Sequence, residues 1–147
     1  MKYLKTYKIF EDVNVDKGNL QRLKDYFEKI DKDITQTFDD NFIQTISDMC
    51  LELDDLGYYI RIYFPQYQKE GVDKILPSCC IDIDSEVGYF LDNKALEMTI
   101  REIQSYVSDF GLDVDIELGS DDQFVTADEF INQYNAEELD VISILIY

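Results

Sequence analysis

The stretch DFGLDVDIEL, residues 109–118, joins the end of a predicted helix to a predicted strand. Gly111 suits the left-handed backbone that closes many helices. Beyond it, apolar and acidic residues alternate with the period of two that gives a strand one buried face and one polar face. The acidic positions of this strand are Asp113, Asp115 and Glu117.

The same order of elements occurs earlier in the chain, at an offset of 54 residues. Asp55-Leu56-Gly57 precedes the strand pattern of residues 58–64, and both units follow a long helical pattern. Helix, glycine and strand form a common unit, so shared physics explains the likeness as well as duplication does. We predict an α+β fold, with two αββ-like halves forming one antiparallel or mixed sheet and helices packed on one face.

Apolar periodicity and turn residues predict the remaining elements. Helices are expected from about Asn19, from Asp39 or Asp40 to a stop at Gly57, over 93–110, and from a capping box at Thr126 and Glu129 to about residue 134. Strands are expected over 58–64, 79–84, 87–91, 112–118 and 141–147, the last apolar enough to be central, and residues 66–77 are expected to be a loop. The chain is expected to consist of a leader or docking segment, residues 1–18, and a single acidic domain, residues 19–147.

Acidic residues dominate the chain, with 32 Asp and Glu against 13 Lys and Arg and a net charge of −19. Residues 1–35 carry a net charge of +1 and residues 36–147 carry −20. This balance opposes direct binding of nucleic acid, which needs basic groups against phosphates. Instead it favours a basic protein as partner.

Several function classes have little support in the composition. The absence of His removes the commonest catalytic base and metal ligand. Cys50, Cys79 and Cys80 are an odd number of cysteines, which favours a reduced intracellular protein. The chain has no His to act as their base, so nucleophilic catalysis by a thiol has little support. No stretch has the length of a membrane span or the pattern of a secretory signal. We therefore expect no enzyme activity, no cofactor, no metal site and no membrane association.

Carboxylates on the predicted strands are the candidate site. On residues 79–84 and 112–118 they alternate with apolar residues and so lie on the face opposite the core. A solvated sheet face, a Mg²⁺-dependent phosphotransfer or nuclease site, and a recognition surface for a basic partner are the competing interpretations. The expected partner-binding residues are Asp82, Asp84, Asp113, Asp115, Glu117, Asp121 and Asp122.

Tyrosine and arginine alternate on the strand predicted over residues 58–64. Tyr59, Arg61 and Tyr63 share the face opposite Ile60 and Ile62. Such a face can stack nucleic-acid bases, but the net charge opposes this. Core packing or a protein interface, where Tyr and Arg are enriched, explains the pattern better.

The first eleven residues, MKYLKTYKIFE, combine a Met-Lys start with aromatics and a few charges. This segment resembles the prohead-targeting leader of internal head proteins of large tailed phages. The resemblance implies packaging into the virion and cleavage after Glu11, with Ile9, Phe10 and Glu11 as the processing motif. An ordinary first strand or amphipathic turn that docks on the body explains the segment equally well.

Taken together, these features favour a non-catalytic acidic protein-binding module encoded by a phage. It is expected to act in the host cytoplasm and to inhibit a basic nucleic-acid-binding or defence protein by presenting carboxylates where phosphates would lie. The alternatives are an immunity protein against a basic toxin, a virion cargo or structural protein, and a metal-dependent enzyme that uses the strand carboxylates.

Overall fold

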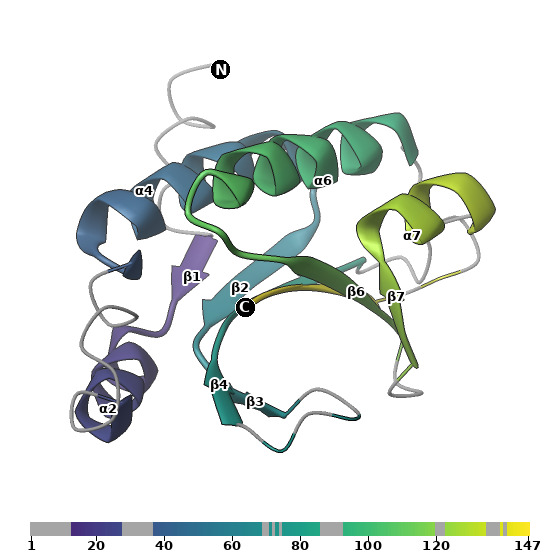
Figure 1. The fold of residues 1–147 in the computed structure, drawn as a ribbon. Coiled ribbons are helices and arrows are strands. Elements are labelled where there is room, and N and C mark those ends of the chain that lie inside the picture. Colours follow the sequence, from purple (N-terminus) through teal and green to yellow (C-terminus); the bar gives the residue numbers. More distant parts are fainter. Residues whose placement is uncertain are drawn as a thin grey trace, which may run out of the picture.

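The computed structural model describes residues 13–27, 37–68, 71, 73, 75–85, 93–119, 123–134, 139 and 141–147. This part of the chain contains both helices and strands, as predicted for an α+β protein (Figure 1). Its helices are α2 (Lys17–Phe27), α4 (Asp40–Met49), α5 (Leu51–Asp55), α6 (Asn93–Ser108) and α7 (Ala127–Gln133).

Six strands form one mixed sheet in the order β1-β2-β5-β8-β6-β7. These strands are β1 (Val13–Val15), β2 (Tyr59–Tyr63), β5 (Cys79–Asp84), β6 (Val114–Leu118), β7 (Gln123–Thr126) and β8 (Val141–Ile146). β1 runs parallel to β2, and the other neighbouring pairs are antiparallel. The prediction that the last strand is central is confirmed, because β8 pairs with β5 on one side and with β6 on the other.

Helices α4, α6 and α7 lie on one side of the sheet, and α2 lies beside the β1 end (Figure 1). The core fills the space between them. On the sheet it is made by the inward residues of each strand, such as Ile60, Ile81, Ile116 and Ile144, all of them fully buried. Leu20, Leu23 and Phe27 of α2 join the same core.

Both predicted helix–glycine–strand units are present, and they end in the same backbone motif. Gly57 and Gly111 have φ angles of 98° and 74°. In the first unit, Tyr58 N–H donates to the Leu53 carbonyl at 3.2 Å and Gly57 N–H to the Asp54 carbonyl at 3.0 Å; the second unit repeats these bonds at residues 112→107 and 111→108. This pattern closes a helix and turns the chain sharply toward the sheet.

The predicted helix starts were right in three of four cases, and α6 begins at Asn93 as expected. Asp39 caps α4 by accepting from Phe42 N–H at 2.8 Å, and the capping box of α7 makes both of its bonds. For α2, however, the cap is Asp16 and not Asn19. The Asn19 side chain instead accepts a hydrogen bond from Phe64 N–H, which ties α2 to the end of β2.

The predicted second helix is interrupted at Cys50, which separates α4 from α5. Leu56, which precedes the predicted stop at Gly57, is 48% exposed because the helix has already ended and the chain is turning.

The region 66–77, predicted to be a loop, contains β3 (Gln66–Gln68) and β4 (Ile75–Pro77), which pair antiparallel in a separate two-stranded sheet. In Figure 1 this hairpin lies on the opposite side of the main sheet from α6.

The expected boundary between residues 18 and 19 falls inside the fold, because β1 and the first residues of α2 precede it. β1 and β7 are additional strands that the sequence patterns did not indicate. The strand expected over residues 87–91 lies outside the described residues, as do residues 1–12 with Ile9, Phe10 and Glu11.

Candidate functional site

The sheet face opposite the core carries a row of aligned polar side chains. Cross-strand pairing links one residue from each strand of the sheet into a single row that follows the strand order. Its members are Asn14, Arg61, Asp82, Ser143, Glu117 and Phe124. Because side chains alternate between faces along a strand, these residues and those two positions away share one surface, here called the polar face.

Asp82 is the centre of a hydrogen-bond cluster on this face. Its Oδ1 accepts from Ser143 Oγ at 2.6 Å on β8 and from Tyr63 OH at 3.5 Å on β2. The Cys80 thiol lies 3.6 Å from the same oxygen. This carboxylate therefore links β2, β5 and β8, and it is also partly exposed to solvent.

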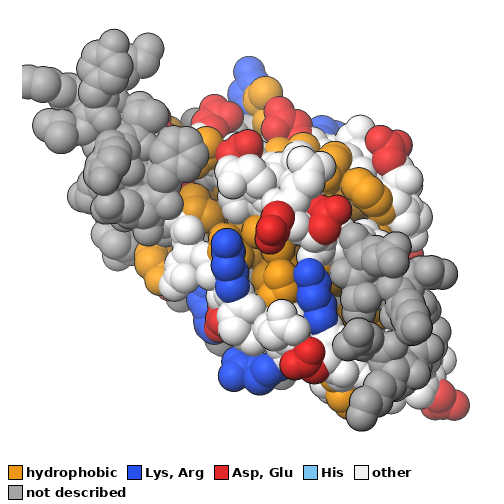
Figure 2. Space-filling view, turned by 90° about the vertical axis from the view of Figure 1, so that its left-hand side faces the viewer, with side chains coloured by type: hydrophobic (Ala, Val, Ile, Leu, Met, Phe, Trp, Pro, Cys, Tyr) orange, Lys and Arg blue, Asp and Glu red, His pale blue; other side chains and the backbone are white. Residues whose placement is uncertain are grey.

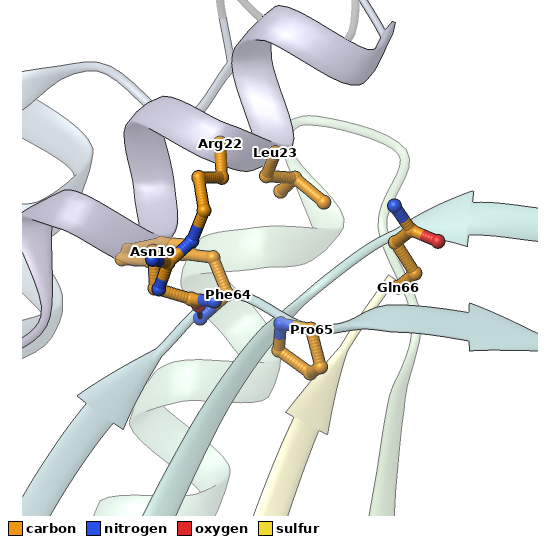
Figure 3. Close-up of a pocket in the computed structure, with 6 residues that line it drawn as sticks. All are labelled: Asn19, Arg22, Leu23, Phe64, Pro65 and Gln66. Carbon is orange, nitrogen blue, oxygen red and sulfur yellow. Dashed lines mark hydrogen bonds between the residues drawn. The ribbon is translucent and has the colours of Figure 1, made fainter.

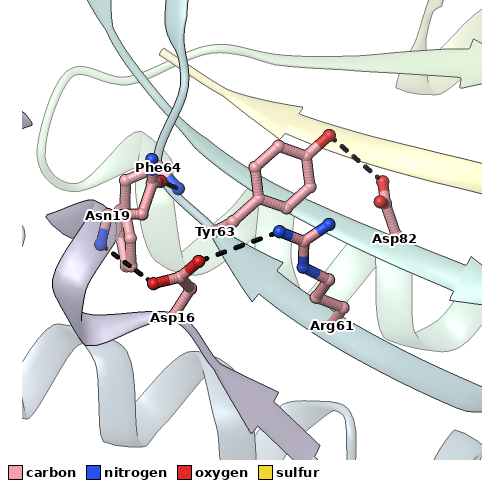
Figure 4. A network of polar contacts seen from close by, with 6 residues as sticks. All are labelled: Asp16, Asn19, Arg61, Tyr63, Phe64 and Asp82. Carbon is pink, nitrogen blue, oxygen red and sulfur yellow. Dashed lines mark hydrogen bonds and ion pairs between the residues drawn. The ribbon is translucent and has the colours of Figure 1, made fainter.

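Arg61 is the single basic residue among the described strands. Its guanidinium lies 3.8 Å from an Asp16 carboxylate oxygen and 4.7 Å from the centre of the Tyr63 ring (Figure 4). Since the Arg61 side chain is 46% exposed, the ion pair contributes at most about 1 kcal/mol to stability. Arg61 is thus held over Tyr63, directly beside Asp82 in the row.

Asp115 differs from the expectation that it points outward. Asp115 is only 8% exposed, and its Oδ2 accepts a hydrogen bond of 2.8 Å from Tyr147 OH. The centre of the Tyr147 ring lies 5.0 Å from that of Tyr67 of β3, and the Tyr67 ring centre lies 5.8 Å from that of Phe124 of β7. The β3–β4 hairpin therefore covers this part of the polar face and buries the carboxylate beneath it.

The remaining predicted partner-binding residues fall into two groups. Asp84 and Asp113 are exposed, and Glu117 is half-buried. All three share the polar face with Asp82 and Asp115, so five of the seven predicted carboxylates lie on one face, with Asp84 and Asp113 at opposite ends of it. Asp121 and Asp122 lie outside the described residues.

Exposed aromatic residues flank these carboxylates. Tyr59 is 47% exposed and Phe124 is 41% exposed. The alternation of Tyr59, Arg61 and Tyr63 was visible in the sequence. Phe124 and Tyr67 were not identified, because their place on the face depends on β7 and on the hairpin, which no local pattern indicated.

The thiols are poorly suited to nucleophilic chemistry. Cys50, Cys79 and Cys80 are all buried. Burial, with a contribution from Asp54, raises the pKa of Cys50 to about 12, and burial also raises the pKa of Cys80 to about 12 and that of Cys79 well above 9.0. A reactive cysteine needs a lowered pKa and access to its substrate, so these three are structural.

A separate cavity of about 330 Å³ lies between α2 and the end of β2 (Figure 3). It is lined by Asn19, Arg22, Leu23, Phe64, Pro65 and Gln66. Its one charged lining residue is basic, so it does not continue the acidic surface. Figure 2 shows the side of the molecule with α2 and α4, where Lys and Arg lie among Asp and Glu.

No metal centre is found in the part of the chain that the structure describes, since its Cys, Asp and Glu residues form no group of three able to hold an ion. The helices of that part include none with the length and apolar character to cross a membrane. Comparison with protein-family models, with curated proteins and with solved structures finds no match to this chain. Function is therefore inferred from the geometry of the chain itself.

The two groups of carboxylates are expected to respond differently to substitution. Asp115→Ala leaves the Tyr147 hydroxyl without its carboxylate and should lower the free energy of unfolding by about 1–3 kcal/mol. Asp113→Ala, at an exposed neighbour on the same face, should change it by less than about 0.5 kcal/mol. Urea denaturation of both variants measures the difference, and equal effects would contradict a buried, bonded role for Asp115.

Proposed function

We propose that this protein is a non-catalytic acidic binding module that attaches to a basic protein through its polar face. In this proposal its partner is a nucleic-acid-binding or defence protein, and the carboxylates take the positions that nucleic-acid phosphates would occupy. The leader resemblance extends the proposal to a phage-encoded inhibitor that acts in the host cytoplasm.

One observation carries the proposal: exposed carboxylates and exposed aromatic rings occur together on a single sheet face. Asp84 and Asp113, with Glu117 half-buried, supply negative charge, while Tyr59 and Phe124 supply apolar contact area. Carboxylates steer a basic partner during encounter, and aromatic anchors commonly provide most of the binding energy of an interface. A merely solvated sheet face would need the charges but not the exposed rings.

The geometry also supports separate roles for the five carboxylates. Asp82 and Asp115 already accept hydrogen bonds from Ser143 and Tyr147, so they order the face. Asp84, Asp113 and Glu117 retain access to a partner. Charge reversal at the exposed positions should therefore weaken binding with little loss of stability.

The test begins with affinity capture of partners from host lysate at low and high salt, followed by kinetics with the purified partner. The variant Asp84→Lys with Asp113→Lys is expected to slow association about tenfold or more at low salt, because it removes steering charge. Glu52→Lys with Glu102→Lys makes the same change in net charge on exposed residues of the helices and is the matched control. It should have a clearly smaller effect.

Duplex DNA or RNA should compete with the protein for its partner if the carboxylates stand in for phosphates. Binding that is insensitive to salt, or a partner with an acidic or apolar contact surface, would contradict the proposal. Equal losses in the two double variants would assign the effect to net charge and not to the polar face.

A further inference from the structure

Two cavities of different chemistry meet at the end of β8. One has a volume of about 400 Å³ and the other of about 340 Å³. Leu112 and Tyr147 line both of them, so these two side chains form a shared wall. The cavities are therefore neighbouring compartments of one groove.

The larger compartment, here the acidic compartment, is lined by Asp113, Asp115 and Asp128 together with Gln104, Ser108 and Thr126. It has no basic lining residue. Asp113 and Asp128 are exposed, and Asp115 lies beneath Tyr147. Its charge and polar groups suit a cationic side chain, which carries several hydrogen-bond donors.

The smaller compartment, here the apolar compartment, has a different character. Besides the shared wall and Thr37, it is lined by Phe38, Leu76, Pro77, Phe110 and Gly111. Phe110 is 46% exposed. An apolar side chain of a partner can enter this compartment and remove the ring from water.

The walls of the groove are fixed by a hydrogen bond and by contacts between aromatic rings. Tyr147 is held by its hydrogen bond to Asp115 and by the ring of Tyr67. The centre of the Phe110 ring lies 5.7 Å from the ring centre of Phe42 and 5.2 Å from that of Tyr106. A groove that exists before binding costs less ordering entropy when it is occupied.

We propose that this groove is an anchoring site for a segment of the basic partner that carries an apolar side chain close to an arginine or lysine. The apolar side chain occupies the apolar compartment, and the cation occupies the acidic compartment on the other side of Tyr147. This inference rests on the proposed function and narrows it to one part of the surface. The two anchor residues stand two positions apart if the segment is extended, because such residues project from the same side.

Charge complementarity decides between occupants of the groove. An acidic or purely apolar segment would leave Asp113 and Asp128 facing a partner that offers them no counter-charge. A basic segment pairs with them and also fits the excess of negative charge over residues 36–147. The apolar compartment adds contact that phosphate mimicry alone does not require.

Labelled nine-residue peptides provide the test, with Phe and Arg two positions apart in a Gly-Ser background. Matched peptides carry Ser in place of Phe, or Glu in place of Arg. The Phe–Arg peptide is expected to bind at least about tenfold more tightly than either matched peptide, measured by fluorescence polarisation. Amide shifts on binding should map to residues 110–115 and 147.

Variants of the protein separate the two compartments. Asp113→Asn with Asp128→Asn should weaken binding of the Phe–Arg peptide about tenfold, since two charge pairs are lost. Phe110→Ala, and independently Leu76→Ser, should weaken it through the apolar compartment, and thermal melts verify that each variant folds. Glu52→Gln with Glu102→Gln is the control, because it removes two exposed carboxylates of the helices that line neither compartment.

Equal binding of all three peptides, no binding, shifts that map elsewhere, or an equal effect of Glu52→Gln with Glu102→Gln would overturn the inference. The proposed function fails separately. The purified partner could bind with strong salt dependence while the variant with both Asp113→Asn and Asp128→Asn binds it like wild type. In that case the groove is not the anchoring site, and the proposed function as an acidic binding module is retained. Loss of salt dependence with the partner would overturn both.

Discussion

Ile144→Ala is expected to destabilise the protein by about 4 kcal/mol, because it removes three carbons from the centre of a closed core. Ile144 is fully buried on β8 and pairs with Ile81 of β5 and Ile116 of β6, which are also fully buried. Strands on both sides limit how far the sheet can collapse into the space. Such a loss is a large share of a domain's free energy of unfolding, which is roughly 5–15 kcal/mol.

Urea denaturation followed by circular dichroism measures this effect. Leu56→Ala is the control, since it also truncates a branched aliphatic side chain, and Leu56 is 48% exposed. It should change the free energy of unfolding by less than about 0.5 kcal/mol. Similar losses in the two variants would contradict the central position of β8 in the core.

Alkaline pH is expected to destabilise the protein steeply. The pKa values of Cys50 and Cys80 are raised by burial from 9.0 to about 12, and that of Cys79 is also well above 9.0. Above pH 9 the unfolded chain therefore releases thiol protons that the folded chain retains, and stability falls as pH rises toward 12. Each thiol contributes a loss of about 1.4 kcal/mol per pH unit, so three thiols lose about 4 kcal/mol per unit.

Burial also raises the pKa of Tyr63 and Tyr147 above 10.0, with help from hydrogen bonding to Cys80 and Asp115 respectively. Their ionisation acts in the same direction at the upper end of this range. We expect reduced protein that is folded at pH 8 to unfold by about pH 11, since the loss then matches typical domain stability.

Denaturation curves from pH 8 to 11 measure the slope. Cys50→Ala and Cys79→Ala should each make it shallower by about 1.4 kcal/mol per pH unit, whatever the variant costs at pH 8. Both variants keep the same lysines and carboxylates, so general charge repulsion is common to all three proteins. Parallel curves for wild type and variants would contradict thiol burial as the cause.

The sequence pattern predicted which sheet face each carboxylate of the candidate site lies on, but not which of them are buried. Alternation placed Asp82 and Asp84 opposite Ile81 and Ile83, and the structure agrees. Alternation assigns a face, but it says nothing about what covers that face. The burial of Asp115 by Tyr147 and the β3–β4 hairpin was invisible for this reason.

The sequence by itself determined the features that depend on a few neighbouring residues. Gly57 and Gly111 closed their helices because the closing hydrogen bonds span only five residues. The Thr126–Glu129 capping box formed because both of its bonds lie within one turn. Local hydrogen bonds of this kind are available wherever the right side chains occur, so their patterns can be recognised directly.

Only the tertiary structure decided which strands became neighbours and which carboxylates became structural. β8 lies between β5 and β6, so Ser143 reaches Asp82 across 61 residues of chain and Tyr147 reaches Asp115 across 32. Such contacts depend on how several apolar faces share one core, a competition among distant segments that no local pattern records. The same competition formed the groove, because its walls come from five separate parts of the chain.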